Sequence, residues 1–260
     1  MALRALNLTR NPQVLIVKTL ATCATINDGT LIKAFCTSPI LRKVIPKKKG
    51  KSSHDWLTRQ LNDPYVKLAK FDQYRARSAY KLREIDDRHK FLCPGQVVVE
   101  CGAAPGAWTQ VAISRINSMP KDENRPQGMM IGVDLLPIQP LPGATLLSGA
   151  DFTLPETQEQ ITNLLNGKKV DVVLSDMAPN ATGTKSLDHD LIMALAYSAL
   201  RFAIHNSGRN ATFLCKVWEG HRDKKLLEDL EKFYNSVKII KPPSSRSNSS
   251  EKFAFARGFK

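Results

Sequence analysis

Three aspartates each follow a short run of residues that favours a β-strand. Asp134 closes the apolar run of "IGVDLLP", Asp151 lies in "SGADF" and Asp176 lies in "LSDMAPN". One such acid would be unremarkable as a turn or cap residue, but a carboxylate at the end of a parallel strand can also accept both ribose hydroxyls of an adenosine. Three of them at consecutive strand ends, around one glycine-containing turn, predict an adenosine-containing ligand.

A turn of small residues precedes these aspartates. In "VVVECGAAPGAWTQVA", residues 97–112, a β-forming run passes through Gly102 and Gly106 into a helix-compatible segment. Glycine has no Cβ, so the backbone can approach a ligand closely at both positions. The GxxxG spacing is not the GxGxxG of dinucleotide-binding proteins, and a tight structural turn explains the two glycines equally well when they are considered alone.

The charge of the predicted site narrows the choice of ligand. A nicotinamide dinucleotide needs its pyrophosphate beside a helix N-terminus, and three carboxylates would repel it. S-adenosylmethionine has a cationic sulfonium, which carboxylates attract. The expected cofactor is therefore S-adenosylmethionine.

Helices alternate with short β-rich runs from residue 54 onward, which is the pattern of a doubly wound α/β sheet. The first four predicted strands are nearly continuous apolar runs, as expected for parallel strands with helices on both faces. The last two are joined by the Pro- and Ser-rich "KPPSSRSNSSE", which is too short for a crossover helix, so they are predicted to pair antiparallel at the sheet edge. The predicted strands are 97–101, 129–133, 170–175, 212–217, 237–240 and 253–256, and the predicted helices are 78–87, 108–116, 155–165, 188–205 and 222–234.

Six motifs follow one another along this framework: "RSAYKL", "ECGAAPGAWTQ", "GVDLLP", "LSDMAPNATG", "FLCKVW" and "SSRSNSSEKF". In this order and spacing they resemble the FtsJ (RrmJ) ribosomal RNA 2′-O-ribose methyltransferases, over roughly residues 54–259. The resemblance implies a Rossmann-like class I fold that uses S-adenosylmethionine. The lead-in "WLTRQLNDPYVKLAK", the "APNATG" run and the basic N-terminus are most similar to the mitochondrial members of that family.

The resemblance also implies which residues form the site. The family has a catalytic Lys-Asp-Lys-Glu tetrad, which corresponds here to Lys81, Asp176, Lys216 and Glu251. Its cofactor pocket corresponds to Gly102, Pro105, Gly106, Trp108, Asp134, Asp151 and Asp176.

The chemistry of these residue types agrees with the implied reaction. Methyl transfer to a ribose hydroxyl needs an aligned oxygen and a base that accepts its proton. A free lysine, with a pKa of about 10.4, is a poor base near neutrality, but desolvation and a second cation can lower that value. We therefore expect Lys216 to be the base, Asp176 to orient it, and Lys81 and Glu251 to fix the ribose. Considered alone, Lys81 would be an exposed helix lysine, Glu251 a solvated acid and Trp108 a core residue.

Basic side chains near the motifs are candidates for contacts with RNA phosphates. Arg246, preceded by Ser244 and Ser245, can bind a phosphate bidentately or can lie in an exposed turn. A solvated helix face explains the remaining candidates equally well, namely Arg75, Arg77, Lys67 and Lys70.

The net charge of +14 over 260 residues is concentrated near the start of the chain. Residues 1–53 contain ten Lys or Arg and a single acid, which leaves 28 basic and 23 acidic residues in the remainder. A long acid-free basic segment is typical of an organellar transit peptide, and a retained basic arm that grips nucleic acid is the alternative. We expect a mitochondrial transit peptide and basic linker at residues 1–50 and a methyltransferase domain at 51–260.

Two classes of feature are not expected. No apolar run approaches the roughly 20 residues of a membrane-spanning helix. The five cysteines and five histidines are dispersed, without the spacing of a metal site or a disulfide framework.

By resemblance, the chain is expected to act in the mitochondrial matrix on a uridine in the A loop of the peptidyl transferase centre. The substrate would be large-subunit ribosomal RNA, either free or in a pre-ribosomal particle, although nothing in the residues themselves identifies the base. One alternative is an RNA-binding ribosome-assembly factor in which catalysis is secondary. Another is a nucleotide-dependent oxidoreductase, which the absence of GxGxxG disfavours, and a third is a messenger RNA cap methyltransferase, for which no cap-stacking aromatic site is evident.

Overall fold

The computed structural model describes residues 58, 61–120, 123–220 and 223–260. The predicted transit peptide and linker lie outside these residues. The described helices are α2 (Pro64–Phe71), α3 (Ala79–His89), α4 (Ala107–Ile116), α5 (Pro155–Leu165), α6 (Lys185–Asn206) and α7 (Asp223–Phe233). The described strands are β1 (Val97–Cys101), β2 (Met129–Asp134), β3 (Thr145–Ser148), β4 (Val170–Ser175), β5 (Ser207–Trp218), β6 (Tyr234–Ile240) and β7 (Glu251–Phe259).

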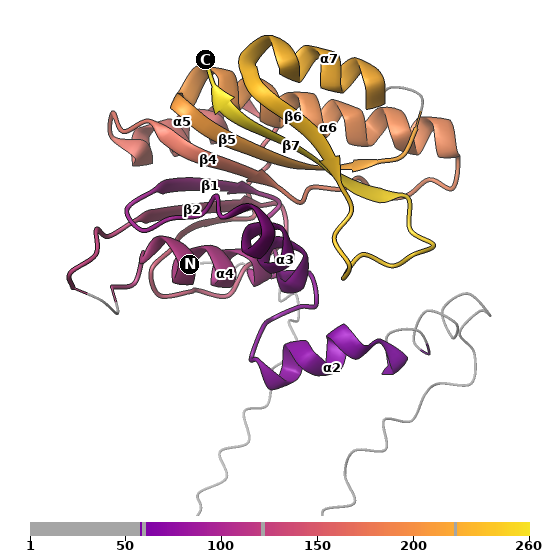
Figure 1. The fold of residues 1–260 in the computed structure, drawn as a ribbon, viewed down its shortest axis with the longest axis horizontal. Helices are drawn as coiled ribbons and strands as arrows, with labels where there is room; N and C mark the ends of the chain where they lie inside the picture. The colour runs from indigo at the N-terminus through magenta and orange to yellow at the C-terminus, as the bar shows by residue number, and fades with distance from the viewer. Residues whose placement is uncertain (1–57, 59–60, 121–122, 221–222) are drawn as a thin grey trace, which may run out of the picture. The chain divides into compact units, whose positions relative to one another are not determined.

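These strands form a seven-stranded sheet in the order β3-β2-β1-β4-β5-β7-β6, which Figure 1 shows between two layers of helices. The first five strands in this order run parallel, and β7 is antiparallel to both β5 and β6. The predicted α/β fold, with a mostly parallel sheet, an antiparallel edge pair and helices on both faces, is confirmed.

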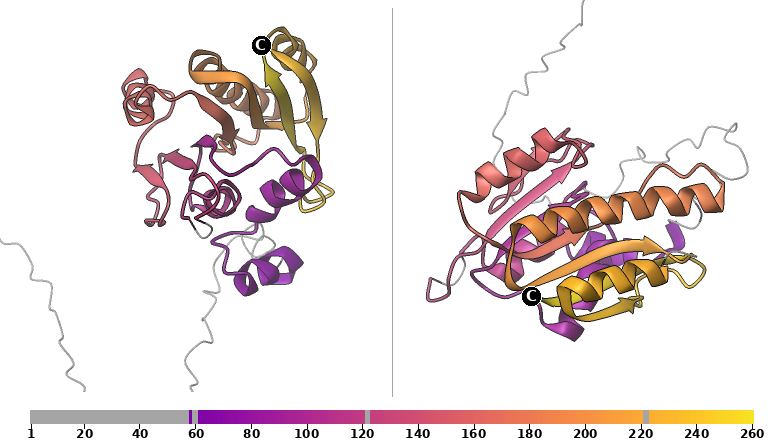
Figure 2. Two further views of the ribbon diagram at one scale, coloured as in Figure 1. Left: turned by 60° about the vertical axis from the view of Figure 1, so that its left-hand side comes forward. Right: turned by 90° about the horizontal axis from the view of Figure 1, so that it is seen from above.

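The apolar runs explain why the sheet is covered on both faces. Successive side chains of a strand point to opposite faces, so a strand covered twice needs apolar residues at every position. Val97 and Val99 of β1 pack into the layer of α5, α6 and α7, whereas Val98 packs into the layer of α3 and α4. Figure 2 shows both layers from the side and from above. All five residues of β1 are buried, so this strand is the centre of the hydrophobic core.

Two of the described elements were given no bounds in the sequence prediction. Strand β3 is the strand expected before Asp151, a half-exposed edge strand of four residues whose short, mixed sequence did not define its bounds. Helix α2 begins at Pro64, and the Asp63 side chain accepts a hydrogen bond from Tyr65 N at 3.0 Å. Proline at the first position and aspartate before it are ordinary helix-start signals, so the sequence did contain evidence for α2.

Candidate active site

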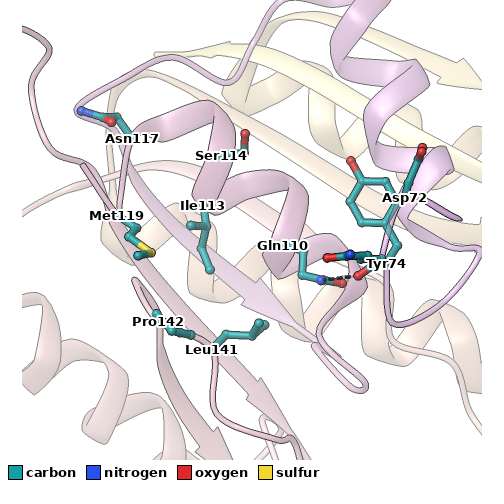
Figure 3. A pocket seen from close by; sticks show the side chains of 10 residues that line it. Asp72, Tyr74, Gln110, Ile113, Ser114, Asn117, Met119, Leu141 and Pro142 are labelled. Atoms are coloured by element: carbon teal, nitrogen blue, oxygen red, sulfur yellow. Dashed lines mark hydrogen bonds between the residues drawn. The ribbon is translucent and has the colours of Figure 1, made fainter. Parts of the chain in front are cut away.

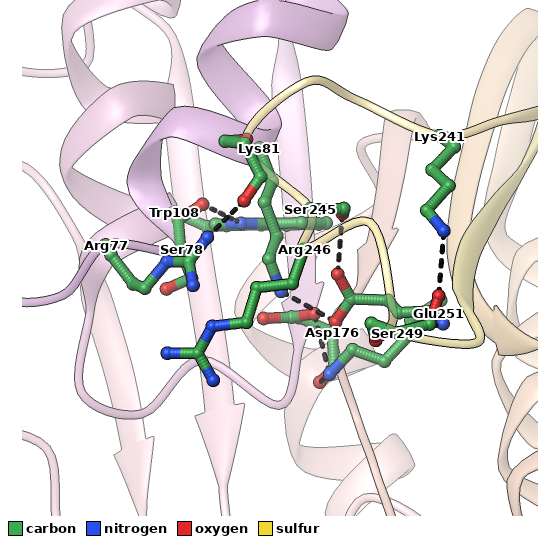
Figure 4. A network of polar contacts seen from close by, with 12 residues as sticks. Arg77, Ser78, Lys81, Trp108, Asp176, Lys241, Ser245, Arg246, Ser249 and Glu251 are labelled. Atoms are coloured by element: carbon green, nitrogen blue, oxygen red, sulfur yellow. Dashed lines mark hydrogen bonds and ion pairs between the residues drawn. The ribbon is translucent and has the colours of Figure 1, made fainter. Parts of the chain in front are cut away.

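The four tetrad residues meet in two ion pairs. Lys81 Nζ lies 2.6 Å from Glu251 Oε2, and Lys216 Nζ lies 2.8 Å from Asp176 Oδ1. The exposed fraction of these four side chains is between 11 and 17%. Figure 4 shows Lys81, Asp176 and Glu251 from three different elements pointing toward one another. The structure thus brings together the four residues that the sequence motifs singled out.

Each element fixes its charged residue through buried neighbours. Lys81 is flanked on α3 by the buried Tyr80 and Leu82, so its position follows from the packing of that helix on the sheet. Lys216 lies on β5 between buried Cys215 and Val217, on the face opposite to theirs.

The two acids of the tetrad are fixed by the sheet itself. Asp176 is the first residue after β4, and its backbone N–H donates to Cys101 O at 3.0 Å, which ties it to the end of β1. Glu251 begins β7 and pairs with Trp218 of β5, two residues beyond Lys216.

The electrostatics of the cluster favour an ionised Glu251. Burial opposes ionisation, but Lys81, the hydroxyl of Ser245 and the more distant Lys216 outweigh it, so the pKa of Glu251 lies below its ordinary value. Ser245 Oγ donates to Glu251 Oε1 at 2.8 Å. Lys216 Nζ also donates to the backbone carbonyl of Asp176 at 2.6 Å. Each lysine of the tetrad is therefore held by one carboxylate of the same cluster.

A cavity of about 230 Å³ opens beside this cluster, and we call it the catalytic cavity. Five residues line it: Arg77, Lys81, Arg246, Ser249 and Glu251. The arginine that the sequence suggested for phosphate binding, Arg246, thus faces the tetrad. Of the two serines that precede it, Ser245 donates its hydroxyl to Glu251, and Ser244 donates its backbone N–H to Glu84 Oε2 at 2.8 Å.

Asp63 links both cavity arginines and was not found from the sequence. The Asp63 Oδ2 atom pairs with Arg77 and also lies 3.1 Å from Arg246 Nη2. Arg77 donates a further hydrogen bond to Ser244 O. Asp63 is buried and precedes α2, so a residue far from the motifs organises the cavity. Local sequence signals could mark Asp63 only as a helix cap, because its arginine partners lie 14 and 183 positions away.

A second cavity, of about 340 Å³, is larger but lacks a comparable cluster of charges. Figure 3 shows it on the outer side of α4, bordered by Tyr74, Ile113, Met119 and Leu141. Asp72 is the one acidic or basic residue among those that line it, and Tyr74 is the other titratable one. General acid–base chemistry needs convergent titratable groups, so the smaller cavity is the candidate active site.

The turn at residues 102–106, which we call the cofactor turn, joins the end of β1 to the start of α4. Gly102 N and Ala103 N both donate to Val133 O, at 2.9 and 3.1 Å. The Asp134 carboxylate accepts from Ala104 N at 2.8 Å and from Leu136 N at 2.7 Å. Asp134 therefore connects the loops that follow β1 and β2, at the edge where a parallel sheet binds its ligands.

The two glycines are required by close contacts within the protein. A Cβ on Gly102 would lie 2.7 Å from the backbone nitrogen of Met177, and one on Gly106 would lie 2.8 Å from Arg75 Nη1. Both residues also have a positive φ, of 82° and 103°. Considered alone, the sequence explained these glycines equally well by the approach of a ligand or by a tight structural turn, and the neighbours named here belong to the protein itself.

The remaining predicted cofactor residues have different surroundings. Pro105 lies in the turn and follows a cis peptide bond, and its carbonyl accepts from Arg75. Trp108 lies in the hydrophobic core, where its indole N–H donates to Ser78 O at 2.8 Å and its ring packs on Phe253. Asp151 accepts from both the N–H and the hydroxyl of Thr153. Of the three predicted aspartates, Asp134 binds the cofactor turn through its carboxylate, and Asp176 binds the end of β1 through its backbone N–H.

Glu100 is a buried acid near Asp134 and Asp176, and it was not identified from the sequence. This residue of β1 is buried and accepts from Thr109 Oγ1 at 2.6 Å. Burial, together with the nearby Asp176 and Asp134, raises its pKa well above the ordinary value although Thr109 opposes the shift. Desolvation is the main cause of this shift, and the carboxylates of Asp176 and Asp134 add to it.

Among the described residues, no group of three or more His, Cys, Asp or Glu side chains is arranged to hold a metal ion. In that same part of the chain, no helix has both the length and the apolar character needed to cross a membrane.

Comparisons with known proteins identify the family of the chain. The family model of the FtsJ-like methyltransferases matches residues 74–259. The chain is 50% identical over 214 residues to a mitochondrial rRNA methyltransferase 2 of Drosophila melanogaster, covering 82% of this chain and 86% of that protein. It is 46% identical over 209 residues to the ribosomal RNA large subunit methyltransferase E of Roseobacter denitrificans, covering 80% and 86%. The crystal structure of a ribosomal RNA methyltransferase from Plasmodium falciparum superimposes with a TM-score of 0.63 at 26% identity, covering 72% of this chain and 98% of that one.

Proposed function

The chain belongs to the FtsJ-like methyltransferase family, and from that premise we propose that it transfers a methyl group from S-adenosylmethionine to ribosomal RNA. The acceptor we propose is the 2′-hydroxyl of a uridine in the A loop of mitochondrial large-subunit ribosomal RNA, either free or in a pre-ribosomal particle. We further propose that residues 1–50 direct the protein to the mitochondrial matrix and that residues 51–260 form the catalytic domain.

The observation that carries the proposal is the meeting of two Lys–carboxylate pairs beside one cavity. Lys81 with Glu251 and Lys216 with Asp176 place two amines and two carboxylates within reach of one small group. Such a set can hold a ribose by its hydroxyls and remove a proton from one of them. Arg77 and Arg246 at the rim supply positive charge for the adjoining phosphates.

The roles of the residues follow from their contacts. When bound, S-adenosylmethionine supplies the electrophilic methyl group, and Asp134, Asp151 and Asp176 are the residues proposed to hold it. Lys216 Nζ is proposed to accept the proton of the 2′-hydroxyl, and Asp176 aims it through both its carboxylate and its carbonyl. Lys81 and Glu251, which line the catalytic cavity, are proposed to bind the ribose.

The choice of ribosomal RNA as substrate is supported by the relatives. The Drosophila and Roseobacter proteins are named for ribosomal RNA, and the former is named as mitochondrial. High identity over more than four fifths of the chain makes a shared substrate class the simplest expectation.

Transfer of a labelled methyl group tests the proposed function. Native protein is incubated with labelled S-adenosylmethionine and ribosomal RNA and is compared with Lys216→Ala. We expect label in the RNA with the native protein and a rate at least about 100-fold lower with the variant, the usual contribution of a general base. Lys232→Ala on α7 is the matched control, because its surface ion pair lies outside the site.

Two results would contradict the proposal. Equal labelling by native protein and Lys216→Ala would remove Lys216 from the chemistry. Label that enters protein or other RNA classes but not ribosomal RNA would reject the substrate.

A further inference from the structure

The Arg75 guanidinium joins two loops that are far apart in the sequence. Its Nη1 atom donates to Pro105 O at 2.9 Å and to Gln139 O at 2.6 Å, and its Nη2 atom donates to Pro140 O at 2.9 Å. Pro105 belongs to the cofactor turn after β1, whereas Gln139 and Pro140 lie in the loop between β2 and β3. One side chain therefore binds three carbonyls on two separate loops.

The segment that contains Arg75 is itself fastened to α4. Arg75 N donates to Gln110 Oε1 at 2.8 Å, and Gln110 Nε2 donates back to Gln73 O at 3.0 Å. The latter bond is visible beside Tyr74 in Figure 3. Because a Cβ on Gly106 would lie 2.8 Å from Arg75 Nη1, glycine at that position leaves the guanidinium the room it occupies.

The two loops lie where a cofactor of a parallel sheet binds. They follow β1 and β2, two neighbouring strands, and ligands of open α/β sheets lie beyond the carboxyl ends of such strands. Asp134 already ties the loops together through Ala104 N. Arg75 provides a second tie between them through different atoms, so the spacing of the loops depends on both residues.

Arg75 and Arg77 serve different parts of the molecule although they are two residues apart. Arg77 lines the catalytic cavity and pairs with Asp63, whereas the guanidinium of Arg75 donates three hydrogen bonds to backbone carbonyls. A guanidinium has five N–H groups, and Arg75 already donates three hydrogen bonds, so few donors remain for a phosphate.

We propose that Arg75 is a positioning residue for the cofactor, which holds the cofactor turn and the loop between β2 and β3 at the separation that S-adenosylmethionine requires. This inference rests on the proposed function, because it assumes that cofactor. It assigns Arg75 to cofactor affinity and not to RNA binding. A lysine would retain the charge, but its single nitrogen cannot span three carbonyls on two loops as a planar fork does.

The test measures S-adenosylmethionine binding by calorimetry, and the Michaelis constants for S-adenosylmethionine and for RNA, in native protein, Arg75→Gln and Arg75→Lys. We expect both variants to bind S-adenosylmethionine about tenfold more weakly or worse, the factor that corresponds to the loss of one charge-assisted hydrogen bond. The Michaelis constant for RNA should stay at the native value. Arg88→Gln, an exposed arginine on α3, is the matched control and should bind S-adenosylmethionine as the native protein does.

Thermal unfolding without cofactor shows whether each variant is folded, and Arg75→Lys is the milder change should Arg75→Gln unfold. Native binding of S-adenosylmethionine by both Arg75 variants would overturn the inference. So would a rise in the Michaelis constant for RNA alone, which would make Arg75 a phosphate ligand. Failure of the native protein to bind S-adenosylmethionine is a distinct result, and it would overturn the proposed function together with the inference.

Discussion

In the cofactor turn, two backbone N–H groups share Val133 O, and two glycines leave room for neighbouring parts of the protein. Beside the catalytic cavity, the four tetrad residues form two ion pairs, one between α3 and β7 and one between β5 and the residue after β4. The first region is built mainly from backbone contacts and the second from side-chain charges. Changes of shape should therefore damage the cofactor turn, and changes of charge should damage the cavity.

Two glutamates make the same contrast. Glu100, on the cofactor side, is buried near other acids, and its pKa is raised well above the ordinary value. Glu251, at the cavity, is partly buried, but Lys81 and its other partners lower its pKa. Identical side chains thus have opposite preferences because only one of them has a cation as a close partner.

The largest effect is expected from Lys81→Ala. The change removes the cation that pairs with Glu251 and leaves that buried carboxylate with less compensation. We expect kcat to fall by about 100-fold, with the Michaelis constant for S-adenosylmethionine little changed, in steady-state assays with labelled cofactor. Lys225→Ala, whose ion pair with Asp229 lies on exposed α7, should keep native kcat. If Lys81→Ala changed only the Michaelis constant for S-adenosylmethionine, Lys81 would belong to the cofactor side and not to the catalytic cavity.

Gly102→Ala should break the cofactor turn by shape alone. The new methyl group would meet the backbone of Met177, and φ is 82° at this position. The expected loss of unfolding free energy is about 2–4 kcal/mol, measured by guanidinium unfolding.

Gly167→Ala separates the two causes of that loss. Its φ of 79° is similar, but nothing lies within 4 Å of the added Cβ, so the expected cost is only about 1 kcal/mol. Equal costs for both variants would show that close contact with Met177 is unimportant.

Glu100→Gln tests the electrostatics of the cofactor side. A folded-state pKa above the unfolded value means that Glu100 contributes its full stability below about 4.5 and that this contribution is lost as pH rises. Above pH 4.5 the free energy of unfolding of the variant should therefore rise relative to that of the native protein. The difference grows by up to about 1.4 kcal/mol per pH unit until Glu100 ionises in the native protein. Unfolding free energies of both proteins between pH 4 and 8 measure the difference, and parallel curves would contradict the assignment.

Glu251→Gln should give a smaller effect of the opposite sign. Because the folded-state pKa is lowered, the stabilisation by Glu251 is present above the ordinary value of 4.5 and is lost as pH falls through the folded-state pKa. The native protein should lose stability toward acid pH more steeply than the variant. Acid unfolding curves of the two proteins that coincide would show that Lys81 does not favour the charged form.

The sequence predicted the parts of this contrast that depend on local pattern. Buried parallel strands are continuous apolar runs, and motif order located Lys81, Asp176, Lys216 and Glu251 before their contacts were known. It did not predict the pairing of Asp63 with Arg77 and Arg246, because these contacts depend on how distant segments cross.

Arg75 and the glycines show the same limit. A basic residue near the motifs suggested a phosphate ligand, and only the folded chain shows three carbonyls around it. Gly102 and Gly106 were recognised as special, but the atoms that require them belong to Met177 and Arg75, which local spacing cannot identify.

The most direct test of the central claim is the position of the methyl group in the product. Ribosomal RNA treated with native protein and S-adenosylmethionine is digested to nucleosides and analysed by mass spectrometry, with Lys216→Ala in parallel. The account predicts 2′-O-methyluridine with the native protein and little or none with the variant. A methyl group on a base, or ribose methylation that is unaffected in the variant, would contradict it.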